Sequence, residues 1–325
     1  MLINEIFSIE TLTEFENVAL SVFRHQAANN LVYKQFVSLL NIDVKEINSI
    51  KEIPFLPIEF FKSHKVLSLS DPIEQVFSSS GTTGTIQSKH YVTNISLYEK
   101  SYVTAFEHFY GNITNYTILA LLPSYMERTG SSLVYMTNDL IVRSKKPKSG
   151  FYLNNLDDLI NTLLELEKNN EKVILIGVSF ALLDLISKKK FKLKNTIIME
   201  TGGMKGRRKE LIRNELHKEL KSGFGVTHLH SEYGMTELLS QAYSKRDGIF
   251  KTPPWMKILI RDSENPLQLL PNKKTGGINI IDLANINSCS FIATQDLGKL
   301  YSDETFEVLG RFDNSDIRGC NLLIS

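Results

Sequence analysis

From residue 76 onward the chain alternates short apolar runs with longer amphipathic stretches, and this alternation constrains its fold more than any other feature. The short runs are rich in β-branched residues and are typical of buried strands, over Tyr116–Leu122, Lys172–Val178 and Thr196–Glu200. The longer stretches carry apolar residues at helical spacing, over Ser96–Tyr110, Leu156–Lys168, Phe180–Lys188 and Arg207–Lys221. The repeated order of strand and helix predicts an α/β fold, in which crossover helices cover a parallel sheet.

The two ends of the chain have different patterns. The first forty residues favour helix, because apolar side chains between Leu12 and Phe23 recur at spacings of three and four. After about residue 245 short strand-like pieces are separated by Pro, Gly and Asn, which predicts an antiparallel sheet. These pieces are Trp255–Arg261, Gly277–Leu283, Ser290–Thr294 and Thr305–Leu309. We expect a single domain over residues 1–325, with an α/β core over 1–245 and a smaller β-rich subdomain with a short C-terminal tail over 246–325.

The charge balance and the apolar runs exclude several classes of protein. The 325 residues include 37 Lys or Arg and 36 Asp or Glu, so no strong overall field attracts nucleic acid. The N-terminus lacks the basic start and apolar core of a signal peptide. The longest apolar run, Val173–Ile186, is shorter than the roughly 20 residues that cross a bilayer. We therefore expect a protein without a membrane span. The two cysteines are far apart and are predicted to be free thiols, which indicates a reducing compartment, and we expect the protein to be cytoplasmic.

A run of small polar residues, Ser78–Thr85, directly follows the apolar pair Val76–Phe77. Glycines within it let the backbone approach an anion, and its serine and threonine hydroxyls add hydrogen-bond donors. The run therefore predicts a loop that holds a polyphosphate. It is not a Walker loop, because the pattern G-x-x-x-x-G-K-[ST] is absent and the next lysine is Lys89. On composition alone, a Ser/Thr-rich turn explains the run equally well.

Three further segments carry side chains suited to a nucleotide site. Residues 231–237 read Ser-Glu-Tyr-Gly-Met-Thr-Glu after a strand-like stretch over Val226–His230, and Glu237 offers the carboxylate oxygen that Mg²⁺ prefers. Residues 294–298 read Thr-Gln-Asp-Leu-Gly, where Asp296 either accepts hydrogen bonds from sugar hydroxyls or shapes a turn. Residues 310–314 read Gly-Arg-Phe-Asp-Asn. Each segment alone is weak evidence for a nucleotide site, so the prediction depends on their order along the chain.

In that order the segments resemble the signature motifs of adenylate-forming enzymes, the superfamily of acyl-CoA synthetases, peptide-synthetase adenylation domains and firefly-type luciferases. The match comprises SSGTTG, YGMTE, T-x-D-x-G and GRxD, and Glu200-Thr201-Gly202-Gly203 is similar to the segment with a glycine pair that precedes YGMTE in that superfamily. The resemblance implies the fold of their large N-terminal domain, an α/β arrangement of parallel sheets flanked by helices with a smaller C-terminal β subdomain.

The resemblance also implies a role for each matched residue. The β- and γ-phosphates of ATP would be held by the loop Ser79, Ser80, Gly81, Thr82, Thr83 and Gly84. Adenine would lie against Gly202 and Gly203 and stack on Tyr233, and Gly234 belongs to the same ATP-binding set. Thr236 would contact the α-phosphate or the acyl carboxylate, Glu237 would bind Mg²⁺, and Asp296 and Arg311 would fix the ribose. The implied reaction is attack of a carboxylate on the α-phosphorus of ATP, which yields acyl-AMP and pyrophosphate through positioning and charge neutralisation.

Two departures from the superfamily pattern narrow the resemblance. The usual TTGxPK reads Thr-Gly-Thr-Ile-Gln-Ser-Lys at 83–89, and only twelve residues follow Asp313, so we expect the superfamily's second domain and its lysine to be missing. The segment Ile53–Lys62, the Ser-Lys-His at 88–90 and the ending Gly310–Cys320 resemble the LuxE family, the acyl-protein synthetases of the bacterial luminescence fatty-acid reductase complex. In that family an acyl-AMP forms, and the acyl group passes to a cysteine near the C-terminus, from which a partner reductase takes it.

Cys320 stands where the resemblance places that acyl-accepting cysteine. Its surroundings agree with the role, because Arg318 nearby favours the nucleophilic thiolate and the end of a chain is often mobile. The other reading is a small buried hydrophobe in a last strand. Cys289 lies in a strand-like apolar context and is expected in the core.

Other functions compete with this one. Gly177-Val178-Ser179-Phe180-Ala181 is close to the G-x-S-x-G elbow of serine hydrolases, with His217, His228 or His230 as the base, although Ala181 replaces the second glycine and Ser179 can instead cap a helix. His228 and His230, two apart on a predicted strand, would project from one face toward a metal or simply lie near the nucleotide. A non-catalytic nucleotide-binding protein is the third competitor.

The sequence therefore predicts an acid-thiol ligase that uses ATP and Mg²⁺ to activate a small carboxylic acid, by the resemblance a fatty acid. The acyl group would pass to Cys320 and then to a partner, an acyl reductase or an acyl carrier protein. The main alternative is a ligase that joins the carboxylate to CoA or to a carrier protein. Nothing in the sequence marks which acid is activated.

Overall fold

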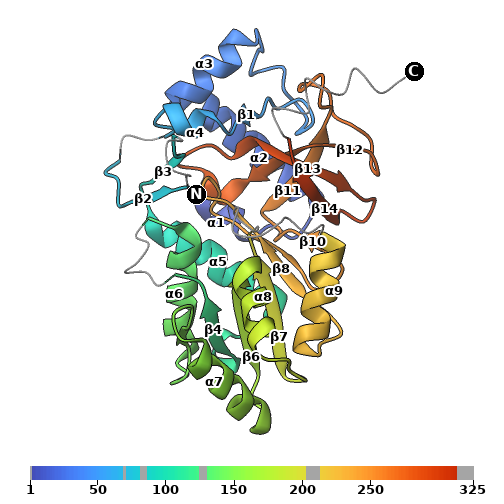
Figure 1. The fold of residues 1–325 in the computed structure, drawn as a ribbon. Coiled ribbons are helices and arrows are strands. Elements are labelled where there is room, and N and C mark those ends of the chain that lie inside the picture. The colour runs from blue at the N-terminus through green and yellow to red at the C-terminus, as the bar shows by residue number, and fades with distance from the viewer. Residues whose placement is uncertain (1, 69–70, 81–85, 124–129, 203–212, 313–325) are drawn as a thin grey trace, which may run out of the picture. The chain divides into compact units, whose positions relative to one another are not determined.

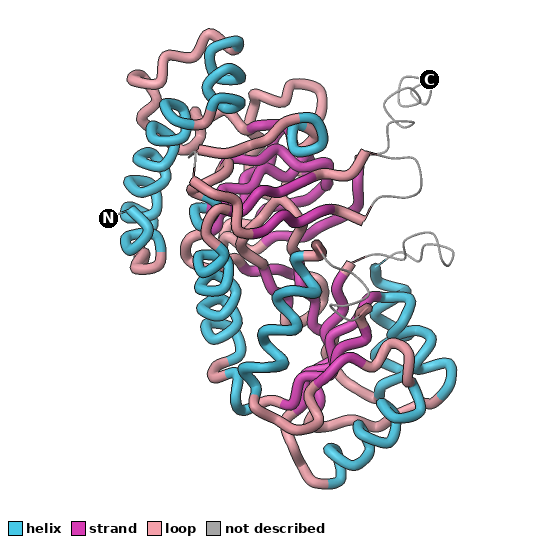
Figure 2. Tube along the Cα trace, turned by 90° about the vertical axis from the view of Figure 1, so that its left-hand side faces the viewer, coloured by secondary structure: helices cyan, strands magenta, loops and turns pink. Residues whose placement is uncertain are grey.

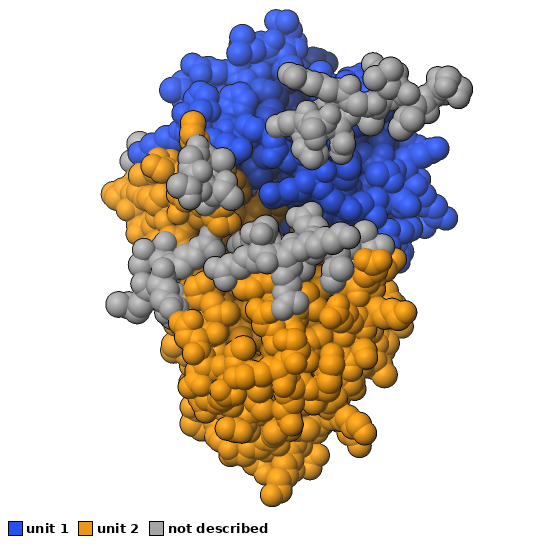
Figure 3. Space-filling model, in the orientation of Figure 1, with its two compact units in different colours: residues 1–70, 254–325 blue, residues 71–253 orange. Residues whose placement is uncertain are grey.

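A computed structural model of the chain describes residues 2–68, 71–80, 86–123, 130–202 and 213–312. The chain divides into two compact units (Figure 3). Unit 1 comprises residues 1–70 and 254–325, and unit 2 comprises residues 71–253. The N-terminal helical pattern and the C-terminal strand pattern therefore share one unit, and the strand–helix alternation forms the other.

A mostly parallel sheet forms the centre of unit 2 (Figure 1). Its strands are β4 (Thr117–Leu121), β5 (Gly150–Phe151), β6 (Val173–Val178), β7 (Thr196–Thr201), β8 (His230–Tyr233), β9 (Ala242–Ser244) and β10 (Ile249–Lys251). They lie in the order β5-β4-β6-β7-β8-β9-β10, parallel from β5 to β8 and antiparallel from β8 to β10. Every residue of β4 and β6 is buried, as expected for strands covered on both faces. The predicted α/β fold is confirmed.

Helices cover both faces of this sheet and give unit 2 three layers (Figure 2). The helices are α5 (Ile95–Tyr110), α6 (Ser132–Ser144), α7 (Leu156–Lys168), α8 (Ser179–Lys188) and α9 (Arg213–Phe224), with a 3₁₀ turn η1 over Ile113–Asn115. Apolar residues of α7, α8 and α9 pack with Leu119, Leu175 and Ile198 on one face. Residues of α5 and α6 pack on the other, around Ile174 and Met199. Alternate residues of each strand thus supply the two halves of the core.

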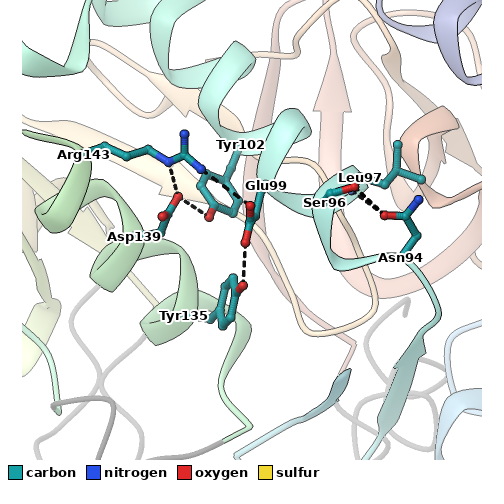
Figure 4. A network of polar contacts seen from close by, with 8 residues as sticks. All are labelled: Asn94, Ser96, Leu97, Glu99, Tyr102, Tyr135, Asp139 and Arg143. Atoms are coloured by element: carbon teal, nitrogen blue, oxygen red, sulfur yellow. Dashed lines mark hydrogen bonds and ion pairs between the residues drawn. The ribbon is translucent and has the colours of Figure 1, made fainter. Parts of the chain in front are cut away.

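Polar side chains join α5 to α6 in unit 2 (Figure 4). Tyr102 Oη donates to Asp139 Oδ2 at 2.6 Å, and Arg143 Nε lies 2.5 Å from the same oxygen. Tyr135 Oη donates to Glu99 Oε1 at 2.7 Å. The N-terminus of α5 is capped by Asn94, whose side chain accepts from the N–H of Leu97. Local capping and these helix contacts fix α5 at the length that the sequence pattern predicts.

An antiparallel sheet forms the centre of unit 1. Its strands, in spatial order, are β11 (Met256–Arg261), β12 (Thr275–Asp282), β13 (Phe291–Leu300) and β14 (Phe306–Arg311). The short strand β1 (Leu56–Pro57) pairs with β13 in parallel, and a 3₁₀ turn η2 (Leu283–Asn285) follows β12. The predicted C-terminal antiparallel sheet is confirmed, and β13 runs six residues beyond the predicted end at Thr294.

Helices from the N-terminal part of the chain complete unit 1. They are α1 (Leu2–Ile6), α2 (Leu12–Asn29), α3 (Leu31–Leu39) and α4 (Phe60–Ser63). Thr11 and Glu14 form a capping box at the start of α2. The side chain of Gln26 donates to the carbonyls of Asn285 and Ile286 and accepts from the N–H of Ser290, so α2 is held against the turn before β13.

The structure corrects two details predicted from the sequence. The strand expected over Val226–His230 is His230–Tyr233, because Gly225 (φ +69°) ends α9 and the N–H of Val226 still bonds to the carbonyl of Lys221. Ser179 is the first residue of α8 and makes no capping bond, so its reading as a helix cap is wrong. The two units also group residues 1–70 with 254–325, whereas the sequence analysis predicted an α/β core over residues 1–245. The single domain over residues 1–325 stays a prediction.

Candidate active site

The ends of two adjacent parallel strands bring sequence motifs together in unit 2. Thr201 ends β7 and is paired with Glu232 in β8, so Gly202 and Gly234 follow at the same edge of the sheet. Ligands of open α/β sheets bind beyond the carboxyl ends of the strands. Gly202 has φ +68°, and a Cβ there would meet no described atom within 4 Å apart from its chain neighbours, while its carbonyl accepts from Ser179 Oγ. This edge is the candidate nucleotide site of unit 2.

The segment after β8 carries the predicted catalytic side chains. Tyr233 is half-buried and makes an edge contact with Phe250, at a ring-centroid distance of 5.9 Å. Thr236 is half-buried, and Glu237 is only 5% exposed. The buried ring of His90, from β3 (Lys89–Val92), lies with Nδ1 2.9 Å from the carbonyl oxygen of Thr236. His90, which the sequence analysis did not assign to the site, therefore connects another part of unit 2 to this segment.

The hairpin that contains His90 also frames the predicted phosphate loop. Its strands β2 (Gln75–Ser78) and β3 (Lys89–Val92) are antiparallel, with Ser78 paired to Lys89. Ser79 donates its N–H to the carbonyl of Ser88, and its Oγ accepts from the N–H of Ser88 at 3.0 Å. The base of the loop is thus held by Ser79, and Ser80 is exposed. The predicted contacts of Gly81, Thr82, Thr83 and Gly84 lie outside the described residues.

A buried glutamate, Glu200, lies next to the candidate site on β7. Its Oε2 lies 3.0 Å from Ser179 Oγ, and its Oε1 lies 3.6 Å from Nε2 of the buried His217. Burial raises the pKa of Glu200, but the neighbouring His217 ring and the charge of Arg213 outweigh burial and leave the pKa below its usual value. Glu200 is therefore an ionised carboxylate inside the protein, held by partners from α8 and α9.

A second buried glutamate, Glu232, behaves in the opposite way. Thr201 Oγ1 donates to its Oε2 at 2.5 Å. Burial and the negative charge of Glu200 raise the pKa of Glu232 to about 7, although the Thr201 hydroxyl lowers it in part. Two carboxyl groups on neighbouring strands thus have pKa values shifted in opposite directions.

The arrangement around Ser179 does not form a hydrolase triad. Its Oγ lies within hydrogen-bond distance of Glu200 Oε2 and of the Gly202 carbonyl, at 3.0 and 2.8 Å, and not of a histidine. A serine nucleophile needs a base such as histidine directly on its hydroxyl. Ser179 therefore has a structural role, which ties β6 and α8 to the residues after β7.

The two candidate metal-binding histidines are also separated by the structure. His230 is in β8 and half-buried, whereas His228 lies before the strand and is exposed, so they do not share a strand face. His230 Nδ1 lies 3.2 Å from Tyr110 Oη, and burial with the charge of Lys245 lowers the pKa of His230 to about 4. Across the described ranges no three or more His, Cys, Asp or Glu side chains form a metal-binding group. The histidine metal site is not supported.

Unit 1 carries the predicted ribose contacts. Asp296 in β13 is paired with Arg311 in β14, and Arg311 Nε lies 3.0 Å from Asp296 Oδ1. The Asp296 side chain is buried, whereas that of Arg311 is 75% exposed. The structure therefore brings these two residues together in one carboxylate–guanidinium pair.

A buried arginine lies beside this pair. Arg261 in β11 donates through its guanidinium to the carbonyls of Ile278 and Thr294 and to Asn279 Oδ1. Its guanidinium carbon lies 5.7 Å from the centre of the Phe312 ring. The negative charges of Glu59 and Asp296 raise the pKa of Arg261, but burial outweighs them and lowers it overall. Arg261 supports the backbone next to Asp296 and was not predicted.

The segment Ile53–Lys62, part of the family resemblance, adjoins the same strand. Leu56 and Pro57 pair with Ile292 and Ala293 of β13, and Gln295 donates to Glu59 Oε1. This segment therefore contacts the Thr294–Gly298 motif and the residues just before it in unit 1.

Of the two cysteines, Cys289 lies within the described residues and Cys320 does not. Cys289 is fully buried, and burial raises the pKa of its thiol to about 12, which agrees with the predicted core position. Cys320, the predicted acyl acceptor, and Gly203, the predicted adenine contact, lie outside the described residues.

No helix in the described part of the chain is long and apolar enough to cross a bilayer.

Comparison with known proteins identifies what the chain is similar to. The family model described as "Acyl-protein synthetase, LuxE" matches residues 113–325, from the 3₁₀ turn η1 before β4 to the last residue of the given sequence. No curated protein sequence matches the chain.

Solved structures share its fold. MatB from Rhodopseudomonas palustris with ATP bound has a TM-score of 0.56 at 18% identity, over 75% of this chain and 49% of that chain. 2-Hydroxyisobutyryl-CoA ligase with 2-HIB-AMP and CoA has a TM-score of 0.69 at 12% identity, over 94% and 70%. MenE, the O-succinylbenzoate coenzyme A synthetase of Bacillus subtilis, with ATP and magnesium, has a TM-score of 0.51 at 18% identity, over 75% and 51%. The fold is that of adenylate-forming enzymes, and the chain spans about half the length of MatB and MenE.

Proposed function

The chain belongs to the family described as acyl-protein synthetase, LuxE, and from this premise we propose that it activates a carboxylic acid with ATP and then carries the acyl group on a cysteine thiol. The observation that most supports the proposal is the joint position of two motifs at one edge of the unit 2 sheet. Gly202 follows β7, and the Tyr233–Glu237 segment begins in the adjacent parallel strand β8. Such an edge is where α/β proteins bind nucleotides.

Within this proposal the ATP-binding residues keep the roles that the sequence assigned. Ser79, Ser80 and the loop after them hold the phosphates, and Gly202, Gly203, Tyr233 and Gly234 hold the adenine. In unit 1, Asp296 accepts from the ribose hydroxyls, with Arg311 paired to its other side. The support comes from the half-buried Tyr233, the position of Gly202 at the end of β7 and the buried carboxylate of Asp296.

A magnesium ion fits the residues of the Tyr233–Glu237 segment. Mg²⁺ is commonly bound through one or two carboxylates together with substrate phosphates, rather than by a full set of protein ligands. Glu237 is a carboxylate on the candidate nucleotide segment, only 5% exposed, and would hold the ion, while Thr236 would contact the α-phosphate or the acyl carboxylate. When bound, the ion neutralises charge on the phosphates as pyrophosphate leaves.

The proposed chemistry has two steps. A carboxylate oxygen of the acid attacks the α-phosphorus of ATP, the bond from that phosphorus to the bridging oxygen breaks, and pyrophosphate leaves with its electrons. The thiolate of Cys320 then attacks the acyl carbon, AMP leaves, and the thiol proton passes to solvent. The protein contributes to the first step by positioning the reactants and balancing charge. Such a step needs hydrogen-bond donors and a carboxylate, and it does not need a histidine that acts as a base on a nucleophilic side chain.

The acid and the final acceptor complete the proposal. We take a fatty acid as the substrate class and an acyl reductase as the partner that receives the acyl group, both from the family. Transfer to CoA is the competing outcome, because 2-hydroxyisobutyryl-CoA ligase, solved with CoA, covers 94% of this chain. A serine hydrolase is disfavoured, because Ser179 contacts Glu200 and not a histidine.

The acyl-carrier step is tested by intact mass spectrometry. The protein is incubated with ATP, Mg²⁺ and a panel of carboxylic acids, and we expect an acyl adduct that hydroxylamine removes. Cys320→Ser should abolish the adduct, whereas the matched variant Cys289→Ala should keep it, because Cys289 is buried and its thiol is protonated at neutral pH. An adduct that persists in Cys320→Ser, or acyl-CoA formation without any protein adduct, would contradict the acyl-carrier assignment.

A further inference from the structure

We infer that Glu232 is a positioning residue of the proposed adenylation site, where its carboxyl group joins the segment after β7 to the segment after β8. The inference rests on the function proposed above and assigns a role to a residue that lies outside YGMTE and to which the sequence analysis gave none. Glu232 touches no substrate in this account. It acts through the backbone that presents Gly202 and through the turn at Gly234.

The first contact is with the end of β7. Thr201 and Glu232 are direct neighbours across the parallel strands, and Thr201 Oγ1 donates to Glu232 Oε2 at 2.5 Å. Thr201 immediately precedes Gly202, whose φ of +68° turns the backbone away from the sheet. The hydrogen bond therefore anchors the last ordered strand residue before the predicted adenine contact.

The second contact is with the turn after β8. A Cβ at Gly234 would lie 2.5 Å from Glu232 Oε1, so the carboxyl group fills the space beside Gly234. Gly234 is the first residue after the strand and starts the segment that leads to Thr236 and Glu237. One carboxyl group thus supports both backbone segments, one through each oxygen.

Charged and titratable groups face Glu232 from several elements. Glu200 approaches from β7 and is ionised, and the buried phenols of Tyr110 in α5 and Tyr243 in β9 both interact with Glu232. Burial raises the pKa of both phenols above the usual value, so they stay neutral. On the same strand, His230 has a pKa lowered to about 4 and is also neutral. Among the described residues no cation forms an ion pair with Glu232.

Two described cations lie near this group of residues: Lys245 lies over the Tyr110 ring at 5.6 Å and its charge acts on His230, and the charge of Arg213 acts on Glu200. Ionised Glu232 would therefore add a second buried negative charge beside Glu200 without a compensating ion pair. Burial and Glu200 accordingly raise the pKa of Glu232 to about 7. The neutral carboxyl group is the form that fits this position.

A pH dependence follows from these contacts. As pH rises through about 7, Glu232 loses its proton, repulsion from Glu200 grows, and the support of both segments weakens. Adenylation should then fall on the alkaline side with the loss of one proton. Glu232→Gln keeps a neutral side chain of the same size that can still accept from Thr201, so this variant should retain activity and lose that alkaline fall.

The experiment measures acid-dependent ATP–pyrophosphate exchange between pH 5.5 and 9. We expect a roughly tenfold fall above pH 7 in the unmodified protein, a flat alkaline side in Glu232→Gln, and low exchange at every pH in Glu232→Ala. The matched control is Glu99→Gln, which changes a partly buried glutamate in the α5–α6 network and should keep the unmodified profile. An alkaline fall of equal size in Glu232→Gln would overturn the inference.

A second readout separates this inference from the proposed function. If the unmodified protein shows no exchange with any acid, the proposed function fails, and amide hydrogen exchange of residues 201–202 and 233–237 then tests Glu232 alone. After correction for intrinsic rates, protection should be lower at pH 8 than at pH 6 in the unmodified protein and independent of pH in Glu232→Gln. The same pH effect in both proteins would contradict a positioning role.

Discussion

At the scale of single residues, His90 shows how the site is held together by contacts that no motif reveals. Its Nδ1 lies 2.9 Å from the carbonyl oxygen of Thr236, and a carbonyl can only accept, so Nδ1 carries the proton. The bond links the β2–β3 hairpin to the segment that carries Thr236 and Glu237. A buried hydrogen bond of this kind contributes about 1 kcal/mol, which is enough to change catalysis if it positions the Thr236 backbone.

Removing this bond should slow adenylation. We expect His90→Ala to lower kcat/KM for ATP by about five- to tenfold, because about 1 kcal/mol of positioning is lost. His90→Asn should restore most of the activity, since its side-chain amide can donate from nearly the position of Nδ1. Steady-state pyrophosphate release measures both variants. Equal loss in His90→Asn and His90→Ala, with both proteins folded, would contradict the positioning account.

Glu237 provides the test of the proposed metal contact. Glu237→Gln keeps the size of the side chain and removes its charge, so pyrophosphate release should fall by about 100-fold and recover in part when Mg²⁺ is raised. Titration of activity against Mg²⁺ concentration measures the effect. A variant whose activity falls without any change in its Mg²⁺ dependence would show that Glu237 does not bind the ion.

Arg311, which is exposed and paired with the buried Asp296, is expected to affect binding more than folding. Because the Arg311 side chain is 75% exposed, Arg311→Ala should change the free energy of unfolding by less than about 1 kcal/mol. Its KM for ATP should rise about tenfold if Arg311 and Asp296 hold the ribose. The matched control is Lys188→Ala, which removes another exposed ion pair, with Asp157, and should leave KM unchanged. A KM that is the same in both variants would remove Arg311 from the site.

The residues that sequence reasoning found and missed differ in the kind of signal they leave. Short motifs identified Tyr233 to Glu237 and the pair Asp296–Arg311. In the structure the first group is one continuous segment that begins in β8, and the second lies on the paired strands β13 and β14. His90 and Glu200 stand in quoted segments, at 88–90 and 200–203, but were given no role in the site because their partners lie far away in sequence, at Thr236 and His217. Glu232 was given no role either, because it lies after the predicted strand Val226–His230 and its burial in β8 is known only from the fold.

At the scale of elements, hydrophobic patterns predicted most of unit 2. Helix α7 was predicted with the observed bounds, and β6 and β7 within one residue at each end. The error at β8 arose because Leu229 and Val226 are apolar for another reason: they pack with the α7–α9 layer after α9 ends. Apolar residues in a connecting segment cannot be told from a short strand by periodicity alone.

Ser179 offers a test of how α8 is joined to the neighbouring strand. Its hydroxyl lies within hydrogen-bond distance of Glu200 and of the Gly202 carbonyl, so Ser179→Ala leaves a buried carboxylate with one partner fewer. We expect a loss of about 1 to 3 kcal/mol in the free energy of unfolding, measured by urea denaturation.

The same residue decides against a hydrolase. Because Ser179 has no histidine on its hydroxyl, a fluorophosphonate should not label it in the unmodified protein.

The control for the urea denaturation of Ser179→Ala is Ser187→Ala. This variant removes an exposed hydroxyl that bonds within α8 and should lower the free energy of unfolding by less than about 0.5 kcal/mol. Labelling at Ser179, or equal stability losses in the two variants, would contradict the structural role.

At the scale of the whole molecule, the grouping of the N-terminal and C-terminal parts in unit 1 could not be predicted from local patterns. It depends on contacts across more than two hundred residues, such as Leu56 with Ile292 in β1 and β13 and Gln26 with Asn285. Each of these segments reads as an ordinary helix or strand when it is considered alone. Only their shared aromatic core, where Phe23, Tyr33 and Phe55 surround Phe291, makes them one unit.

The central claim for the whole molecule is that it forms an acyl-adenylate. The most direct measurement is exchange of labelled pyrophosphate into ATP by the full chain, with a panel of short to long carboxylic acids. We predict exchange that requires both Mg²⁺ and one class of acid, that falls about 100-fold in Glu237→Gln and that is unchanged in the control Glu99→Gln. Absence of acid-dependent exchange with every acid in the panel, from a protein shown to be folded, would contradict the account.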